Sequence, residues 1–269
     1  EDRNRIGAEA RFLRGFYHFE AIKIWHKVPF VDETITYEAG NYHLDNNAVI
    51  WPAIENDFRF AVENLKPGMN AVGRANKYAA EAFLAKVYVF QGKFAEAQPL
   101  FQDLIDNGVT ALNKKYGLVN YADNFNAETK NSPEAVFSAQ MSVNDPGGEN
   151  GNGGDNLNFP HTGGPGGCCG FFQPSQWLVN HFKTDAITGL PDLDHFNDEP
   201  VKNDEGLQST DPFVPYGGSL DPRLDWTVGR RGIPYLDWGD HPGYNWIRKQ
   251  DFSGPYTPKK NVYYKSQEG

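Results

Sequence analysis

The stretch NKYAAEAFLAKVYVFQGKFAEAQPLFQDLIDN, from Asn76 to Asn107, decides the fold of this chain. Its apolar residues recur at intervals of three or four over Tyr78 to Val89 and again over Phe94 to Ile105, as they do on one face of a helix. Gly92 separates the two patterns, and Gly108 follows the second as a helix stop. We therefore predict two amphipathic helices in an antiparallel hairpin. The seam between them is expected to be filled by Tyr88, Phe94 and Phe101.

The order of small and aromatic residues in this hairpin resembles the helix-turn-helix unit of a tetratricopeptide repeat, with an ordinary antiparallel helix pair as the alternative. Such a hairpin buries its apolar stripe only by stacking on further helices. The sequence predicts two of these, one from Arg3 to Lys27 and one that starts near Asn47 with Pro52 in its first turn. The apolar stripe expected on the first consists of Ile6, Ala10, Leu13, Phe16, Tyr17 and Ile24, and the buried edge of the second of Ile50, Ile54, Phe58, Val62 and Leu65.

The second half of the chain has a different character. A short strand is expected over residues 134–143, and beyond it only residues 174–182 suggest a helix. Ten of the residues from Gly147 to Gly170 are glycine, and proline, glycine, aspartate and aromatic residues alternate after them. We predict a mainly α fold: a tetratricopeptide-like helical scaffold over residues 1–143, and a loop-rich ligand-binding region over residues 144–269 packed on it. Functional sites are often found on such loops.

Charge and hydropathy limit the possible partners. Lys and Arg total 25 against 35 Asp and Glu, a net charge of −10, which disfavours nucleic acids and anionic membrane surfaces. No apolar run reaches the roughly 18 residues of a membrane helix. The chain does not begin with Met and opens directly into a helical pattern, so we expect an internal piece of a longer protein.

The loop over residues 235–246, YLDWGDHPGYNW, combines flat aromatic side chains with polar groups that suit a sugar. A sugar ring has an apolar C–H face that packs on an aromatic ring, and a rim of hydroxyls that need hydrogen-bond partners. Trp238, Tyr244 and Trp246 are expected to point outward. The alternative is that these aromatics form a small core beneath the loops. The predicted ligand-binding residues are Tyr235, Trp238, Asp240, Tyr244, Asn245 and Trp246.

Three other clusters contain groups that could support chemistry. An oxygen-rich loop could hold Ca²⁺, although an ordinary solvated loop is the stronger interpretation and no cofactor is predicted. The neighbours Cys168 and Cys169 either close a ring disulfide or stay free thiols. An acidic stretch raises the possibility of a glycosidase, but nothing fixes two carboxyls at a catalytic separation, so no catalytic residue is predicted. The calcium candidates are Asp145, Glu149, Asn150, Asn152, Asp155 and Asn156, and the acidic stretch contains Asp192, Asp194, His195, Asp198 and Glu199.

Three segments together resemble the SusD/RagB family. They are residues 8–19, AEARFLRGFYHF, followed by Val28-Pro29; residues 167–175, GCCGFFQPS; and residues 221–230, DPRLDWTVGR, continued by GIPY at 232–235. They occur in the order typical of the family, with its helical hairpin between the first two. The resemblance implies a SusD-like α-α superhelix that lacks its N- and C-terminal parts here, and a structural role for Cys168 and Cys169.

The same resemblance implies a function. Members of the family are surface-exposed outer-membrane lipoproteins that capture glycans, or in some relatives peptides, and carry out no chemistry. They deliver the ligand to a partner SusC-like TonB-dependent transporter. We therefore expect a non-catalytic glycan-binding protein whose lipid anchor lies outside this chain. An oligopeptide-capture protein on the same scaffold is the alternative, and a carbohydrate-active hydrolase is a weaker one.

Overall fold

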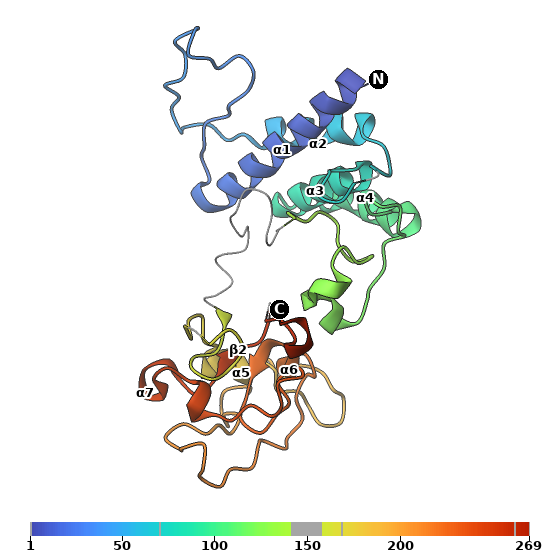
Figure 1. Cartoon of the computed structure of the whole chain (residues 1–269). Coiled ribbons are helices and arrows are strands. Elements are labelled where there is room, and N and C mark those ends of the chain that lie inside the picture. Colours follow the sequence, from blue (N-terminus) through green and yellow to red (C-terminus); the bar gives the residue numbers. More distant parts are fainter. Residues whose placement is uncertain (1, 70, 141–157, 168, 261, 269) are drawn as a thin grey trace. The chain divides into compact units, whose positions relative to one another are not determined.

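The structure is a computed structural model that describes residues 2–69, 71–140, 158–167, 169–260 and 262–268. It divides into two compact units (Figure 1). The first comprises Glu1–Val119 and Asn131–Gln140, and the second Asn120–Lys130 and Met141–Gly269. The predicted boundary at residue 143 falls in a part of the chain that is not described, so it stays a prediction. Residues 120–130 belong to the second unit, where Gln267 Nε2 donates to Asn126 Oδ1 at 2.8 Å.

The helical unit contains the four long helices that the sequence predicts. The hairpin is confirmed, because α3 and α4 are joined at Gly92, which adopts a φ of 71°. Asn76 begins α3, since its side chain accepts a hydrogen bond from the backbone of Ala79. Pro52 lies in the first turn of α2 as expected. The bounds are α1 Asp2–Trp25, α2 Trp51–Asn64, α3 Lys77–Phe90 and α4 Phe94–Asn107.

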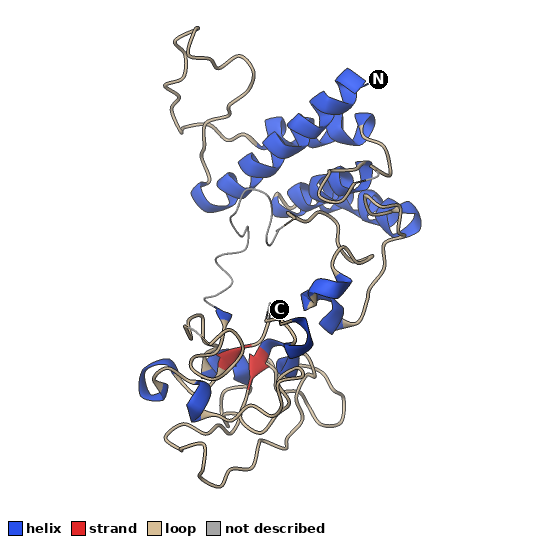
Figure 2. Cartoon of the chain, viewed as in Figure 1, coloured by secondary structure: helices blue, strands red, loops and turns tan. Residues whose placement is uncertain are grey.

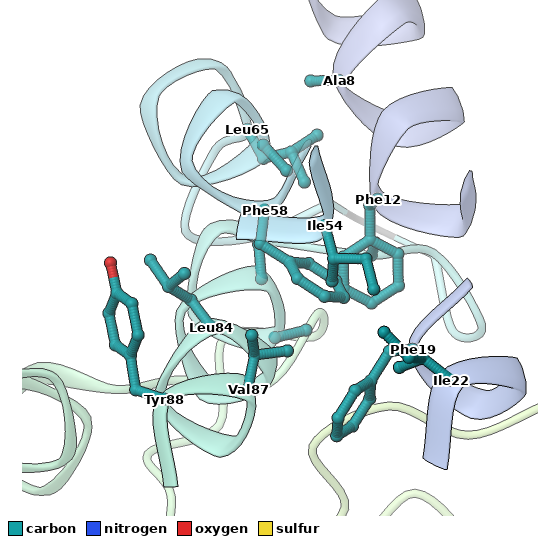
Figure 3. Packing of buried hydrophobic residues seen from close by; sticks show 14 of the residues in the cluster. Ala8, Phe12, Phe19, Ile22, Ile54, Phe58, Leu65, Leu84, Val87 and Tyr88 are labelled. Atoms are coloured by element: carbon teal, nitrogen blue, oxygen red, sulfur yellow. The ribbon is translucent and has the colours of Figure 1, made fainter. Parts of the chain in front are cut away.

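One hydrophobic core joins α1, α2 and α3. Figure 3 shows Phe12 and Phe19 of α1 converging with Phe58 of α2 and Val87 of α3, all of them fully buried. The rings of Phe12 and Phe58 meet edge to face, with centroids 5.6 Å apart. Burial of each such side chain stabilises the fold by about 1.5–3 kcal/mol, so this cluster holds the unit together. Of the edge predicted for α2, Ile50, Ile54, Phe58 and Leu65 are buried and Val62 is half-buried.

The apolar stripe predicted for α1 is wrong, because the helix buries a different face. Ile6, Leu13, Tyr17 and Ile24 are 43–67% exposed, and Ala10 is exposed as well, whereas Phe16 is half-buried against the core. The reason is that α1 is apolar on two sides, and only one side packs on α2. The packed side consists of Ala8, Phe12, Phe19 and Ile22.

Ion pairs and a glycine explain why α1 packs by that side. Asp57 of α2 is buried, and its carboxylate accepts hydrogen bonds of 2.7 Å from Arg11 and from both the Nε and Nη2 of Arg14. A buried carboxylate needs such partners. Gly15 faces the same place, where a Cβ would lie 3.3 Å from the Asp57 Cβ and the Phe58 ring. The segment RFLRG therefore sets the close contact between the two helices.

The expected aromatic seam between α3 and α4 is wrong in part. Tyr88 is buried, but Phe94 is 66% and Phe101 40% exposed. The buried residues of α4 are instead Ala97 and Leu104. The aromatic rings of Phe94 and Phe101 are therefore partly in solvent and do not fill the seam as expected.

The second unit consists largely of loops between short elements (Figure 2). Strands β1 and β2 pair antiparallel, with Val228 opposite Pro258 and Gly229 opposite Thr257. The expected helix within 174–182 is confirmed as α5, whereas the expected strand is absent over residues 134–140 and its last three residues lie outside the described part. The elements are η1 Tyr121–Phe125, η2 Ala127–Thr129, α5 Gln176–Asn180, α6 Leu224–Thr227, β1 Val228–Gly229, η4 Tyr244–Trp246, α7 Gln250–Ser253, β2 Thr257–Pro258 and η5 Lys265–Gln267.

The chain is therefore mainly helical with few strands, and its fold class is as predicted. None of the helices in the described ranges is long and apolar enough to cross a membrane.

Candidate ligand-binding surface

The predicted sugar-binding loop folds back on itself over residues 232–241, so that its two arms are hydrogen-bonded to each other. The backbone of Gly232 donates to the carbonyl of His241 at 2.9 Å, and Tyr235 donates to that of Gly239 at 2.8 Å. Leu236 and Gly239 adopt φ angles of 51° and 93°, which turn the chain back on itself. Trp238 therefore lies at the tip of this loop.

Two of the predicted ligand-binding side chains form the core beneath the loop. Tyr235 is fully buried and its hydroxyl donates to the carbonyl of Pro258 at 2.5 Å. Trp246 is 8% exposed, and its ring meets that of Tyr235 edge to face at 5.4 Å. The expectation that Trp246 points outward is therefore wrong. A large indole gains more by packing against Tyr235 and His241 than by contact with water.

The ionisable groups under the loop are also satisfied internally. The backbone of Gly243 donates to His241 Nδ1, so Nε2 carries the hydrogen and donates to Thr257 Oγ1 at 3.0 Å. Burial lowers the pKa of His241 to about 3, and the charge of Lys259 acts in the same direction. Burial also lowers the pKa of Lys259 to about 8, while its Nζ donates to the carbonyls of Pro234 and Asp225. These groups support the loop from below.

The other four predicted residues reach the surface. Tyr244 is 41% exposed, and Asn245 beside it on η4 is exposed, held in place because its backbone donates to Ser209 Oγ at 3.0 Å. Asp240 is exposed on the returning arm of the loop. Trp238 is half-buried, with its indole N–H bonded to the carbonyl of Tyr263 at 3.1 Å. The side chains of Tyr244, Asn245 and Asp240 are thus available to a ligand. The ring of Trp238 is available only in part.

Sequence reasoning missed further exposed aromatic side chains in the same unit. Phe171 is 47% and Phe172 66% exposed, and the guanidinium of Arg248 lies 4.7 Å from the centre of the Phe171 ring. Trp177 on α5 is 59% exposed. The sequence offers a structural role only for the neighbouring Cys168 and Cys169 in this segment and predicts no ligand-binding role for Phe171. Burial in loops follows no periodicity, so the sequence offered no signal for exposure.

The structure places the remaining candidates less favourably for chemistry. In the acidic stretch, Asp194, Asp198 and Glu199 are exposed, Asp192 is half-buried, and His195 Nδ1 lies 3.0 Å from Asp198 Oδ2. The calcium candidates from Asp145 to Asn156 lie outside the described residues. Within the described ranges no group of three or more His, Cys, Asp or Glu side chains is placed to hold a metal ion. Cys169 is disulfide-bonded, and Cys168 lies outside the described part.

The chain is similar to known proteins in both sequence and fold. The SusD family profile matches residues 133–268. A SusD-like protein of Bacteroides ovatus is 28% identical over 152 residues, which cover 49% of this chain and 26% of that protein. The crystal structure of a SusD-like protein from Bacteroides fragilis aligns with all of this chain and 54% of that one, at 19% identity and a TM-score of 0.63.

A second Bacteroides fragilis structure, that of a SusD-like carbohydrate binding protein, covers 99% of this chain and 49% of that one, at 20% identity and a TM-score of 0.57. The chain thus spans about a quarter of the length of the Bacteroides ovatus relative and about half of each solved structure. At these identities the solved structures show the fold, while the family profile covers 136 of the 269 residues. On this evidence the chain belongs to the SusD family.

Proposed function

We propose that this protein binds glycans without cleaving them. The observation that carries the proposal is the exposed pair Tyr244 and Asn245 on the loop surface of a SusD family member. An exposed phenol ring offers a flat apolar face to a sugar, and the amide beside it can donate to and accept from hydroxyls. Asp240 adds a further acceptor, and Trp238 contributes the accessible part of its ring. The similarity to a SusD-like carbohydrate binding protein supports the same function.

The proposal extends to the protein's place in the cell. A captured glycan is delivered to a SusC-like TonB-dependent transporter, and the protein acts as a surface-exposed lipoprotein of the outer membrane. The net charge of −10 favours an uncharged ligand, because it repels polyanions that come within a Debye length of the surface. The acidic stretch around His195 is exposed, which supports binding over hydrolysis. A glycosidase needs an environment that gives its acid and its base different pKa values, and carboxyl groups in water lack such an environment.

The test is a binding panel with product analysis on the full-length protein. Affinity gel electrophoresis would use dextran, mixed-linkage β-glucan, galactomannan and xylan as neutral polysaccharides, polygalacturonate and alginate as anionic ones, and a mixed oligopeptide pool followed by calorimetry. We expect retardation by at least one polysaccharide. Size-exclusion chromatography after prolonged incubation should show that polysaccharide at its original length.

Two other results would contradict glycan binding without cleavage. Binding to the peptide pool with no retardation by any polysaccharide would replace glycan capture with peptide capture. Shortened polysaccharide would indicate a hydrolase, and an Asp198→Asn variant would then be the first to examine for loss of turnover. Asp251→Asn is the matched control, because it removes one exposed carboxylate that belongs neither to the acidic stretch nor to the proposed ligand-binding residues.

A further inference from the structure

A second aromatic surface lies on α5 (labelled in Figure 1), whose Val179 belongs to a different core cluster from Tyr235 and Trp246 of the predicted loop. The helix begins at Ser175, whose hydroxyl accepts from the backbone of Leu178 at 3.2 Å. Its inner side carries Val179, which is fully buried, whereas Trp177 on its outer side is 59% exposed. His181 follows four residues after Trp177, so both rings lie on the same side of the turn. Their centroids are 3.8 Å apart.

Phe196 completes a group of three rings that meet edge to face or tilted. Its centroid lies 3.8 Å from that of His181 and 5.7 Å from that of Trp177. The loop that carries it is tied to α5, because Asn180 Nδ2 donates to Asn197 Oδ1 at 2.8 Å. We call Trp177, His181 and Phe196 the α5 platform. Rings fixed in this way lose little conformational freedom when a ligand packs on them.

The polar groups at the edge of the α5 platform are mainly acceptors. The Trp177 carbonyl can only accept, so His181 Nδ1, 2.8 Å from it, must be the donor. In the neutral imidazole this leaves Nε2 as an acceptor. Asp194 and Asp198 flank Phe196 two residues away on either side, and both are exposed. A ligand with hydroxyl donors and an apolar face suits this surface.

The charges favour one class of such ligands. Asp194, Asp198 and Glu199 would repel a uronic acid or a sulfated sugar, while Lys183 already donates to the Glu199 carbonyl and the His195 ring is engaged with Asp198 Oδ2. A purely structural role for the rings accounts for Phe196 and His181, which hold the loop on α5. It leaves unexplained why the largest ring, Trp177, keeps more than half of its surface in water.

We propose that the α5 platform is a binding site for neutral sugar rings, with Trp177 as the stacking surface and the flanking carboxylates as hydroxyl acceptors. This rests on the proposed glycan binding and adds to it a second site and a preference for neutral over anionic glycans. Two aromatic sites on one unit would let a polysaccharide be held at two points, which raises its apparent affinity.

The test compares Trp177→Ala with Phe252→Ala, which removes an aromatic ring that is 88% exposed on α7 and pairs with no other ring of the described residues. Oligosaccharides of whichever neutral polysaccharide binds in the panel are titrated by calorimetry, with oligogalacturonate as the anionic probe. Trp177→Ala is expected to weaken binding about tenfold, and Phe252→Ala to leave it unchanged. Circular dichroism checks that both variants keep the parent fold.

A spectroscopic readout keeps the test valid even if Trp177→Ala is poorly folded. Each tryptophan contributes one indole N–H resonance, and the one missing in Trp177→Phe identifies Trp177. The neutral oligosaccharide should shift this resonance in the parent protein, and oligogalacturonate should not. If the Trp177 resonance does not move and Trp177→Ala binds with unchanged affinity, the proposed α5 site is wrong, while the proposal of glycan binding stands. Binding of anionic glycans alone overturns the preference, and no glycan binding by the parent overturns both proposals.

Discussion

Glu81 carries an unusual charge environment within the helical unit. It lies on α3 with 4% of its surface exposed, and one carboxyl oxygen has no hydrogen-bond partner in the described structure. Burial, and then the negative charge of Asp103 on α4, raise its pKa from 4.5 to about 7. The folded state therefore keeps a proton that the unfolded chain releases above pH 4.5.

This predicts a pH-dependent loss of stability that a single substitution should remove. Because the folded chain binds more protons than the unfolded one between pH 4.5 and about 7, its free energy of unfolding falls as the pH rises through that window. Glu81→Gln should be more stable than the parent by about 1–2 kcal/mol at pH 8. Urea unfolding from pH 4 to 8 measures this. Glu96→Gln, on the exposed side of α4, should retain the parent's dependence.

Tyr235 offers a second residue-level prediction, because its role is structural in this account. Burial raises the pKa of its hydroxyl above the usual range, so the group stays protonated and donates to the Pro258 carbonyl. Tyr235→Phe leaves that acceptor unpaired and should cost about 1–2 kcal/mol, seen as a lower melting temperature. Tyr244→Phe should melt like the parent. Equal melting temperatures for all three proteins would show that Tyr235 does not support the loop as described.

At the scale of elements, the pairing of β1 with β2 depends on one glycine. A Cβ at Gly229 would lie 2.2 Å from Thr257 Oγ1 and 2.6 Å from the ring of Tyr235. Gly229→Ala should therefore separate the strands and destabilise the protein by about 3 kcal/mol or more. Gly217→Ala is the matched control, since a Cβ there meets nothing within 4 Å. Denaturant unfolding of the two variants compares them, and equal stability would contradict the strand register.

The sequence could predict helical elements because their signals are local. Periodic apolar residues, Pro52 and Gly92 all act within a few residues, and the helices, the first-turn proline and the turn glycine are found where they were expected. Which face of a helix is buried is a different question. Both Phe12 and Leu13 belong to apolar rows of α1, and only the fit of Gly15 and Arg14 against Asp57 selects the first. That contact joins residues more than 40 positions apart, so no local pattern reveals it.

The loop elements could not be predicted in the same way. Whether Tyr235 or Tyr244 faces the solvent depends on the pairing of Gly229 with Thr257 and on the turn at Gly239. The two tyrosines have similar neighbours in sequence, yet one is fully buried and the other 41% exposed. The sequence thus located a stretch rich in surface aromatics without distinguishing them from the core, and it missed the α5 platform because Phe196 reaches Trp177 only in the folded chain.

At the scale of the whole molecule, the helical unit presents apolar rows on its two outer helices. Ile6, Leu13, Tyr17 and Ile24 lie exposed along α1, and Phe94, Phe101 and Ile105 along α4. Exposed apolar surfaces of this kind favour contact with other protein surfaces. The second unit instead exposes single aromatics among polar loops, which suits sugars. We therefore propose that the helices make protein contacts and that the loops capture the ligand.

The measurement that tests this central assignment is calorimetric titration of the full-length protein with a neutral oligosaccharide, using the parent and a Trp177→Ala/Tyr244→Ala double variant. The account predicts saturable binding by the parent, little or none by the double variant at the same concentrations, and recovery of the oligosaccharide at its original length. Unchanged binding by the double variant would contradict the assignment of capture to these exposed rings.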